Sequence, residues 1–174
     1  VGGPPHASDC ERGRRPGTYA DMVEFFKLSQ SFDVLHLLSP CVEPQDIDIK
    51  VRHLKTTAAE LTLSDKSPFI YCRGPGQVAD CFEMVRIARG LDEDTFVNRP
   101  VCHSVVNTNS PRQLDVPMCQ GIMDFARAGQ VCIITPFTLS GAMAPVTIAG
   151  ALVLQHAEAM AGITLSQTVR PGAP

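Results

Sequence analysis

The chain has 174 residues, of which 44% are hydrophobic and 19% are charged, and its formal net charge is −3. This length and composition are sufficient for one ordinary globular core. The slight negative charge argues against nucleic acid and against an anionic membrane surface as partners. The longest apolar segment, Pro145 to Leu154, is too short to cross a membrane and is interpreted as a buried helix.

Cysteines fall singly along the chain, at Cys10, Cys41, Cys72, Cys81, Cys102, Cys119 and Cys132. Their number is odd and no two are spaced as Cys-x-x-Cys, which favours reduced thiols in a cytoplasmic protein over a disulfide framework. Cys102 and His103 are adjacent, so in a strand they point to opposite faces and cannot easily share a metal ion. We therefore expect no metal in this chain.

The first half of the chain is predicted to alternate between strands and helices after an opening loop. Residues 1–17 are rich in Gly, Pro and Arg and are expected to form that loop. Thr18 and Asp21 have the spacing of a capping box, which predicts a helix over 19–30. The further predicted elements are strands over 34–38 and 68–72 and helices over 46–61 and 77–89.

The second half continues the alternation. Residues 131–134 are a continuous apolar run, as expected of a strand that is buried on both faces. Helical spacing predicts a helix from Pro145, which suits a first turn, to Gly162, which is interpreted as its stop. The remaining predicted elements are strands over 101–106 and 163–169 and a helix over 113–128.

About five strands therefore alternate with helices, which predicts a parallel sheet covered by helices. The strand starts are roughly 30 to 35 residues apart, the size of a βαβ unit. A doubly wound sheet and a (β/α)8 barrel both fit this pattern. No Gly-x-Gly-x-x-Gly string follows a predicted strand, so a dinucleotide-binding sheet loses its main support. A complete barrel takes about 250 residues, so five units would be an arc of one.

Several long strings carry a family resemblance. They are Gly2 to Pro5, Asp9 to Gly17, Pro40 to Asp46, Thr135 to Thr147, Gln155 to Ala159 and Val169 to Pro174. Together they closely resemble the trimethylamine methyltransferase (MttB-like) family, and the likeness runs along the whole chain. The resemblance implies a partial (β/α)8 TIM barrel in an α/β protein, with residues 1–174 as an internal fragment of a single barrel methyltransferase domain.

The resemblance also implies a reaction. Members of this family move a methyl group from a methylated amine to the Co(I) corrinoid of a separate small protein, in methylamine catabolism and methanogenesis. It implies a cytoplasmic enzyme whose corrinoid, a cobalamin-type cofactor, is bound on the partner, and a homo-oligomer in its full-length form. The pyrrolysine of the archaeal members would lie beyond Pro174, so the catalytic group is unknown here.

Three functions stay open. Homologues without pyrrolysine, such as glycine betaine methyltransferases, are similar in this region, so the substrate is trimethylamine or a quaternary amine. The third function is a non-catalytic docking surface for the corrinoid protein.

Active sites of such barrels lie at the C-terminal ends of the strands. That rule selects Glu43, Arg73, Asn107, Asn109, Thr135, Phe137, Gln167 and Arg170 as residues facing the substrate or the corrinoid. We expect Asn107, Asn109, Thr135 and Arg170 to line the mouth of the barrel, and Asp9 and Arg12 could face it too. Each residue also has an ordinary structural interpretation: the asparagines as turn residues, Phe137 as loop packing and the arginines as surface pairs.

Overall fold

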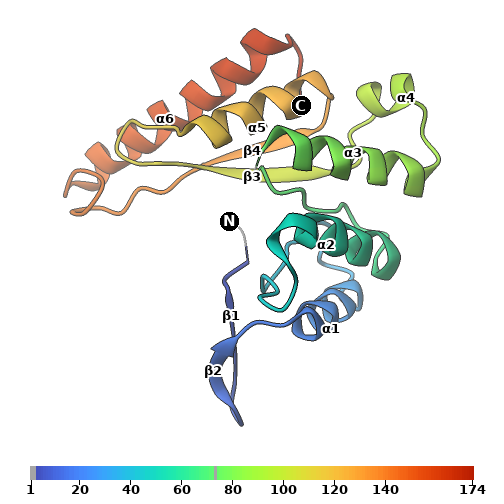
Figure 1. Ribbon diagram of the computed structural model, residues 1–174. Coiled ribbons are helices and arrows are strands. Elements are labelled where there is room, and N and C mark those ends of the chain that lie inside the picture. Colours follow the sequence, from blue (N-terminus) through green and yellow to red (C-terminus); the bar gives the residue numbers. More distant parts are fainter. Residues whose placement is uncertain (1–2, 73) are drawn as a thin grey trace.

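The structure is a computed structural model that describes residues 3–72 and 74–174. Its elements in chain order are β1 (His6–Asp9), β2 (Gly13–Pro16), α1 (Tyr19–Gln30), α2 (Ile49–Leu63), α3 (Pro75–Arg89), α4 (Glu93–Asn98), β3 (His103–Thr108), α5 (Val116–Arg127), β4 (Val131–Pro136) and α6 (Ile148–Val169). A hairpin of β1 and β2 projects beside α1 and α2, and the pair of β3 and β4 lies with α5 and α6 on one side of it (Figure 1).

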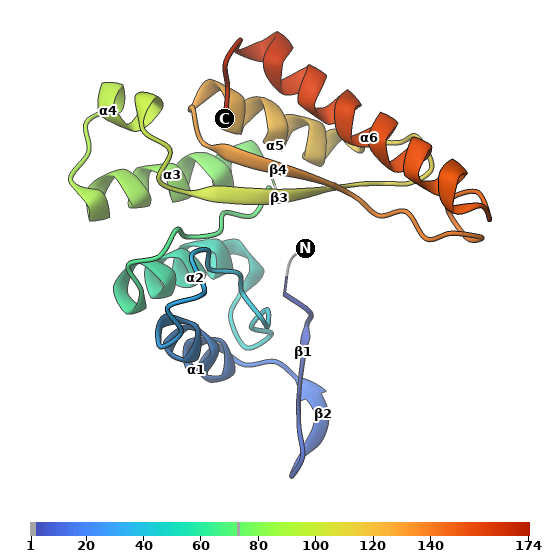
Figure 2. The same cartoon turned by 180° about the vertical axis from the view of Figure 1, so that it is seen from behind.

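The parallel pair of β3 and β4 carries the second half of the chain. Val106 lies opposite Ile134 and Asn107 opposite Thr135. Val106 is fully buried in a core cluster that includes Phe125 of α5. Side chains alternate between the faces of a strand, so Asn107 and Thr135 project from the face that α5 does not cover. Figure 2 shows α5 and α6 on the same side of the pair from the opposite direction.

Two isolated parallel bridges extend this arrangement toward the N-terminus, joining Leu37 to Ser67 and Phe69 to His103. Four extended segments therefore lie side by side in sequence order. The prediction of regular strands over 34–38 and 68–72 is wrong. Each segment is extended but forms only isolated β-bridges. Pro68 has no N–H, so it accepts a bond from the His103 N–H at 3.1 Å without returning one.

Two hydrophobic clusters support the two halves of the molecule. The larger one comprises Ile70, Cys72, Val78, Cys81, Val85, Phe96, Cys102, Val106, Ile122 and Phe125. The smaller one comprises Ala7, Met22, Phe26, Leu38, Val42 and Ala59. The first packs α3 and α5 against the parallel segments, and the second packs α1 and α2 against the loop after Leu38.

The N-terminal segment is a β-hairpin, so the expected loop over residues 1–17 is wrong. Asp9 pairs with Gly13, whose φ of 66° suits the left-handed position of a short hairpin connection. The base of the hairpin is bonded to the following loop: the Glu43 N–H donates to the Pro4 oxygen at 2.9 Å and the Gln45 N–H to the Gly17 oxygen at 2.8 Å. These bonds fix the loop that holds Glu43.

Helix α6 continues to Val169, so the expected stop at Gly162 and the strand over 163–169 are both wrong. Gly162 lies inside the helix because α6 approaches β4 there; an added Cβ would meet the Cγ2 of Ile134 at 2.9 Å. Leu165 and Ser166 then pack toward the core. This packing outweighs the local preference of the β-branched residues for a strand.

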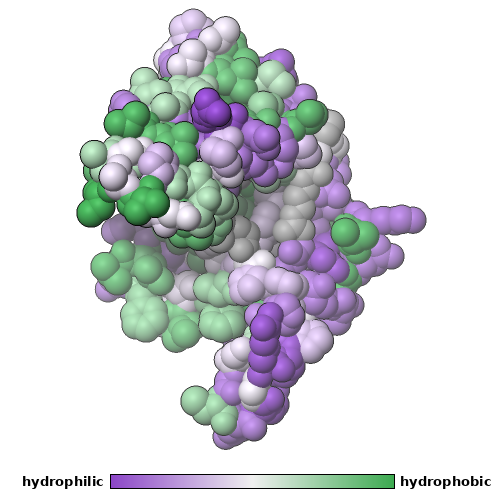
Figure 3. Space-filling view, turned by 90° about the vertical axis from the view of Figure 1, so that its left-hand side faces the viewer, coloured by the Kyte–Doolittle hydropathy of each residue, from purple (hydrophilic) through white to green (hydrophobic). Residues whose placement is uncertain are grey.

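The length expected for the apolar segment is also wrong. Helix α6 has 22 residues, and by length and composition alone it could span a membrane. Core helices of soluble proteins meet the same criterion but are mostly buried, whereas only 11% of the apolar window of α6 is buried, so the expectation of a buried helix is wrong as well. Many of its hydrophobic side chains are exposed, and Figure 3 shows hydrophobic residues gathered over the upper part of the molecule, the part that contains α6 in Figure 1.

The short helix α4 follows α3 and was not expected from the sequence. Its N-cap is Asp92, whose carboxylate accepts a bond from the Thr95 N–H at 2.7 Å. Phe96 anchors it in the larger cluster and is 3% exposed. The other helices lie where they were predicted, within a few residues at each end.

Candidate functional site at the strand ends

The ends of β3 and β4 bring two of the predicted residues together. The Thr135 hydroxyl donates to the side-chain oxygen of Asn107 at 3.2 Å and contacts the Val106 carbonyl oxygen at 3.3 Å. Both side chains are half-buried. The pair forms a fixed, neutral polar group at the C-terminal edge of the two strands.

A hollow of about 510 Å³ adjoins Thr135 at this edge. It is lined by Ile134, Thr135, Pro136, Leu152, Gln155, His156 and Ala159. Gln155 and His156 come from α6, so the helix contributes polar groups next to the end of β4. The sequence rule did not select these two residues, because it selects loops at strand ends rather than positions on helices.

The loop after β3 is closed by Asn109. Its N–H donates to the Gln113 oxygen at 2.8 Å, and its side-chain oxygen accepts from the Asp115 N–H at 3.0 Å. Asp115 is itself the N-cap of α5 and accepts from the Met118 N–H at 2.8 Å. Asn109 therefore has the turn-forming role that its residue type suggests, at a position two residues beyond Asn107.

Glu43 lies in a second polar group, at the edge of a pocket of about 210 Å³. Its carboxylate pairs with the Arg52 guanidinium at 3.2 Å, with only 13% and 15% of the two side chains exposed. Arg52 also donates to the Ile47 oxygen at 2.9 Å, which holds the loop against α2. The pocket is lined by Pro40, Glu43, Pro44, Ile49, Arg52, His53, Thr56, Tyr71 and Gln77.

Tyr71 connects this pocket to the N-terminal segment. Its hydroxyl accepts a bond from the Gly3 N–H at 2.8 Å. An added Cβ on Gly3 would lie 2.3 Å from the Pro40 oxygen, so only glycine allows this approach. The lining of the pocket thus includes the Glu43 carboxylate and the Tyr71 ring. Both kinds of group attract a compact cation.

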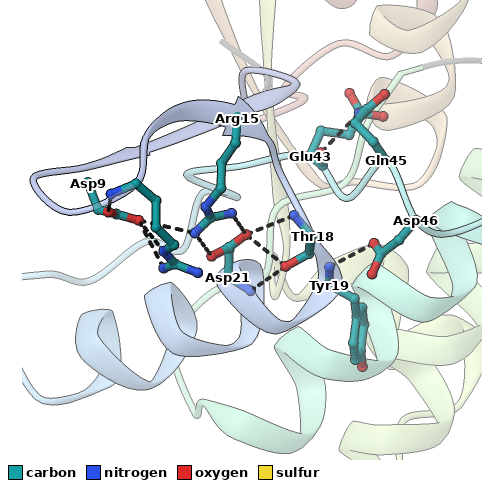
Figure 4. A network of polar contacts seen from close by, with 9 residues as sticks. Asp9, Arg15, Thr18, Tyr19, Asp21, Glu43, Gln45 and Asp46 are labelled. Atoms are coloured by element: carbon teal, nitrogen blue, oxygen red, sulfur yellow. Dashed lines mark hydrogen bonds and ion pairs between the residues drawn. The ribbon is translucent and has the colours of Figure 1, made fainter.

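A network of polar contacts fastens the hairpin to α1 (Figure 4). Arg15 donates to Asp21 at 2.6 Å, and Asp21 accepts from the Thr18 N–H at 2.9 Å. The hydrogen bonds from Arg15 and then from Thr18 hold the pKa of Asp21 well below its usual range. Asp9 and Arg12 pair with each other at 2.9 Å in the hairpin turn. Their expected place at the mouth of a barrel stays a prediction.

Gln167 and Arg170 are not brought together with Asn107 and Thr135. The expectation that they follow a fifth strand is wrong, because both lie at the C-terminal end of α6. Arg170 donates to the Val97 oxygen at 3.1 Å, near Gly129 and the start of β4. Gln167 bonds to the Ala173 oxygen and the Gly172 N–H, both at 2.8 Å. Their interactions close the turn after α6.

Phe137 adds little to this geometry, because it follows β4 directly and is 53% exposed. The remaining predicted residue, Arg73, lies outside the described residues.

Sequence reasoning missed Glu158, a buried carboxylate on α6. It accepts bonds from the Thr108 and Ser110 hydroxyls and from the Arg112 N–H. The available signal is a single acidic residue in the long apolar stretch of α6, since buried acids are rarely left without partners. Its partners lie up to 50 residues away, so the sequence does not identify them.

Parallel segments joined by helices, with polar side chains near the strand ends, define a mixed α/β protein. The family model described as trimethylamine methyltransferase (MTTB) matches residues 1–174. The chain therefore belongs to the trimethylamine methyltransferase family.

Named relatives agree with this assignment. The chain is 35% identical over 173 residues to a glycine betaine methyltransferase of Desulfitobacterium hafniense, covering 99% of the chain and 36% of the relative. It is 28% identical over 160 residues to a trimethylamine methyltransferase MttB of the same species, covering 92% and 32%. It is 35% identical over 91 residues to the MttB of Methanosarcina barkeri, covering 52% and 18%. The chain thus spans about a third of the length of such relatives.

Proposed function

We propose that the protein containing this chain transfers a methyl group from a methylated amine to a corrinoid carried by a separate protein. The observation that carries this proposal is the match of the family model to residues 1–174. Relatives named for trimethylamine and for glycine betaine support a methylated amine as the substrate class. The corrinoid partner, a cytoplasmic location and a homo-oligomeric full-length enzyme belong to the same proposal.

The proposed fold is an arc of a (β/α)8 barrel. Support comes from the sequence-ordered parallel contacts between the segments at Leu37, Ser67–Phe69, β3 and β4. Helices α2, α3 and α5 each lie between two consecutive segments in the chain. In such a barrel, Asn107 and Thr135 would project toward its interior at the active-site end.

The polar groups at the strand ends fit the binding of an amine. A quaternary ammonium group has no N–H, so it is held by carboxylates, oxygen dipoles or aromatic faces. Glu43 and Tyr71 supply the first and the last of these, and the fixed Asn107–Thr135 pair supplies oxygen dipoles. The reduced cobalt of a corrinoid would supply the nucleophile, so these residues need only bind the amine, orient it and exclude water.

Glycine betaine is a specific second candidate for the substrate. The chain aligns over 99% of its length with the glycine betaine methyltransferase at 35% identity, and over 92% with MttB of the same species at 28%. The quaternary amine would carry its own carboxylate, and a cationic partner such as Arg52 lies in the pocket with Glu43. These observations support a quaternary amine as the second candidate substrate, next to trimethylamine.

The test uses the complete gene product, mixed with a corrinoid protein held in the Co(I) state. Trimethylamine and glycine betaine are added separately, and formation of methyl-cobalt is followed by absorbance. We expect that one of the two amines methylates the cobalt. Mass spectrometry should then detect the demethylated product of that amine. If the complete product bound the corrinoid protein but methylated it with neither amine, the docking-surface alternative would replace the proposal.

A further inference from the structure

We propose that Glu158 is a positioning residue, which holds the loop after β3 so that Asn107, at the start of that loop, is presented to the methylated amine. This inference rests on the proposed function. Glu158 lies on α6, whereas Asn107 and the loop that Glu158 holds lie at and after the end of β3.

Glu158 is buried, with 5% of the residue exposed. One carboxylate oxygen accepts from the Thr108 hydroxyl and from the Ser110 hydroxyl at 2.6 Å, and the other accepts from the Arg112 N–H at 2.6 Å. All three donors come from the five residues 108–112. A single carboxylate therefore replaces the solvent for three polar groups of one loop.

The hydrogen bonds to Glu158 favour the ionised form of its carboxylate. Burial raises the pKa of Glu158, but the hydrogen bonds from Ser110, Thr108 and the Arg112 N–H together outweigh burial and hold the pKa below its usual range. Hydrogen bonds to a charged acceptor are about twice as strong as neutral ones. Glu158 is thus suited to fixing the loop rather than to exchanging a proton.

The loop needs such an anchor. Arg112 has a φ of 57°, a left-handed conformation that is unfavourable for a residue with a side chain. The bond from its N–H to Glu158 fixes the loop there, and Asn109 fixes it on the α5 side through Gln113 and Asp115. The loop is therefore held between α5 and α6, with Asn107 at its start.

Helix α6 carries both Glu158 and residues that line the hollow beside Thr135. Gln155 and His156 precede Glu158 on the same helix and line the hollow beside Thr135. Releasing Glu158 would let the loop move relative to these residues and to the Asn107–Thr135 pair. Misplacement of a binding group by about 1 Å can cost on the order of 100-fold in rate.

The experiment compares Glu158→Ala with Glu158→Gln in the complete protein. A glutamine can accept from the Arg112 N–H and donate to the hydroxyl oxygens of Thr108 and Ser110. We expect E158A to raise KM for the amine and lower kcat/KM by about 10-fold or more, and E158Q to restore most of the loss. Glu24→Ala is the matched control, because Glu24 is an exposed helix residue in a surface pair with Lys27.

A positioning role also predicts that the effects of substituting Glu158 and Asn109 are not additive. In an Asn109→Ala background, E158A should lower kcat/KM less than it does in the native background. An undiminished loss, or an E158A protein with native kcat and KM, would overturn the proposal. If E158A does not fold, Ser110→Ala removes one donor from the loop side, and the same comparison with Asn109→Ala is made there.

Hydrogen–deuterium exchange separates this inference from the proposed function. In E158A, amides of residues 107–115 should exchange at least about 10-fold faster, whereas E24A should leave them unchanged. If the native protein transfers no methyl group but E158A accelerates this exchange, the function fails and the anchoring of the loop stands. Unchanged exchange in a folded E158A protein would contradict the anchoring itself.

Discussion

Thr135 donates its hydroxyl hydrogen to the side-chain oxygen of Asn107 at 3.2 Å, across the ends of two adjacent parallel strands. The backbone register places the two residues directly opposite each other. Because the side-chain oxygen of Asn107 is fixed by this bond, the orientation of its amide plane is fixed as well. The pair is therefore preorganised before any ligand arrives, which reduces the entropy lost on binding.

The first prediction tests this pair. Thr135→Val keeps the shape of the side chain and removes the hydroxyl, so the Asn107 amide loses its restraint. A neutral hydrogen bond contributes about 0.5–1.5 kcal/mol, so kcat/KM of the complete enzyme should fall by about 3- to 10-fold. Thr135→Ser keeps the hydroxyl and should retain most of the activity. Equal kinetics for the valine and native proteins would show that the pair has no role in the reaction.

The parts of the fold that depend on neighbouring residues could be predicted from the sequence. Helix α1 is one example, because its capping box joins Thr18 to Asp21 only three residues later. The start of β4 is another, because Val131 to Ile134 form a continuous apolar run. The predicted strand ends, at 106 and 134, are each two residues short, so Asn107 and Thr135 lie within the last residues of β3 and β4 rather than in the loops that follow.

The parts of the fold that depend on contacts between distant residues could not be predicted from the sequence. Gly162 has the local signature of a helix stop, and only the approach to Ile134 explains why the helix continues through it. Glu158 is one acidic residue among apolar ones until Thr108 and Ser110 are placed beside it. Sequence reasoning therefore found two residues at the strand ends and missed the carboxylate that holds their loop.

The second prediction concerns Asp21, which joins the hairpin to α1. Asp21 is the N3 residue of the capping box whose N-cap is Thr18. Asp21→Asn should destabilise the protein by about 1 kcal/mol or more, because Arg15 and Thr18 lose a charged hydrogen-bond acceptor. Unfolding in urea at pH 7 measures the effect. Exposed Asp33→Asn is the control and should leave the transition midpoint unchanged. If D21N and the native protein had equal midpoints, the bonds from Arg15 and Thr18 to this carboxylate would contribute nothing to stability.

The same residue gives a pH dependence with a definite sign. Hydrogen bonds from Arg15 hold the folded-state pKa of Asp21 below its unfolded value of about 3.9. Its stabilising contribution is therefore complete above about pH 4 and is lost as the pH falls below that value toward the folded-state pKa. The stability difference between the native protein and D21N should shrink as the pH falls from about 4 to about 2. A difference that stays constant down to that pH would contradict the assigned bonds.

The third prediction concerns Glu60, which is 1% exposed. Burial raises the pKa of this carboxyl well above its usual value, and the bond from the Phe69 N–H at 3.1 Å offsets only part of that effect. Because the folded-state pKa exceeds the unfolded one, stability should decrease as the pH rises from about 4.3 through the folded-state pKa. The slope can reach about 1.4 kcal/mol per pH unit.

Glu60→Gln tests this interpretation, because the amide oxygen can still accept from Phe69 and the side chain cannot ionise. The free energy of unfolding of E60Q should depend less on pH between about 5 and 8 than that of the native protein. Glu83→Gln is the control, since Glu83 is exposed and pairs with Arg86 on the surface of α3. Parallel pH profiles for the native and E60Q proteins would mean that Glu60 titrates normally.

The fourth prediction ranks three glycines by the space around them. An added Cβ at Gly121 of α5 would lie 2.4 Å from the Cβ of Cys72, whereas at Gly162 it would meet the Cγ2 methyl group of Ile134 at 2.9 Å. At Gly76 of α3 it would meet nothing within 4 Å. The contact at Gly121 is 0.5 Å shorter, and the Cys72 Cβ is fixed to its backbone, whereas the Ile134 methyl group is one bond further from its own backbone. Gly121 therefore has less freedom to accommodate a methyl group.

Gly121→Ala should therefore destabilise the protein most, by about 1–3 kcal/mol, and Gly162→Ala should cost less. Gly76→Ala should be neutral or stabilising by up to about 1 kcal/mol, because alanine reduces the entropy of the unfolded chain without strain in the fold. Thermal unfolding of the three variants measures the order. Equal losses in all three would indicate a general cost of changing helix glycines, and would contradict the close approach of α5 to the segment at Cys72 on which the larger core cluster depends.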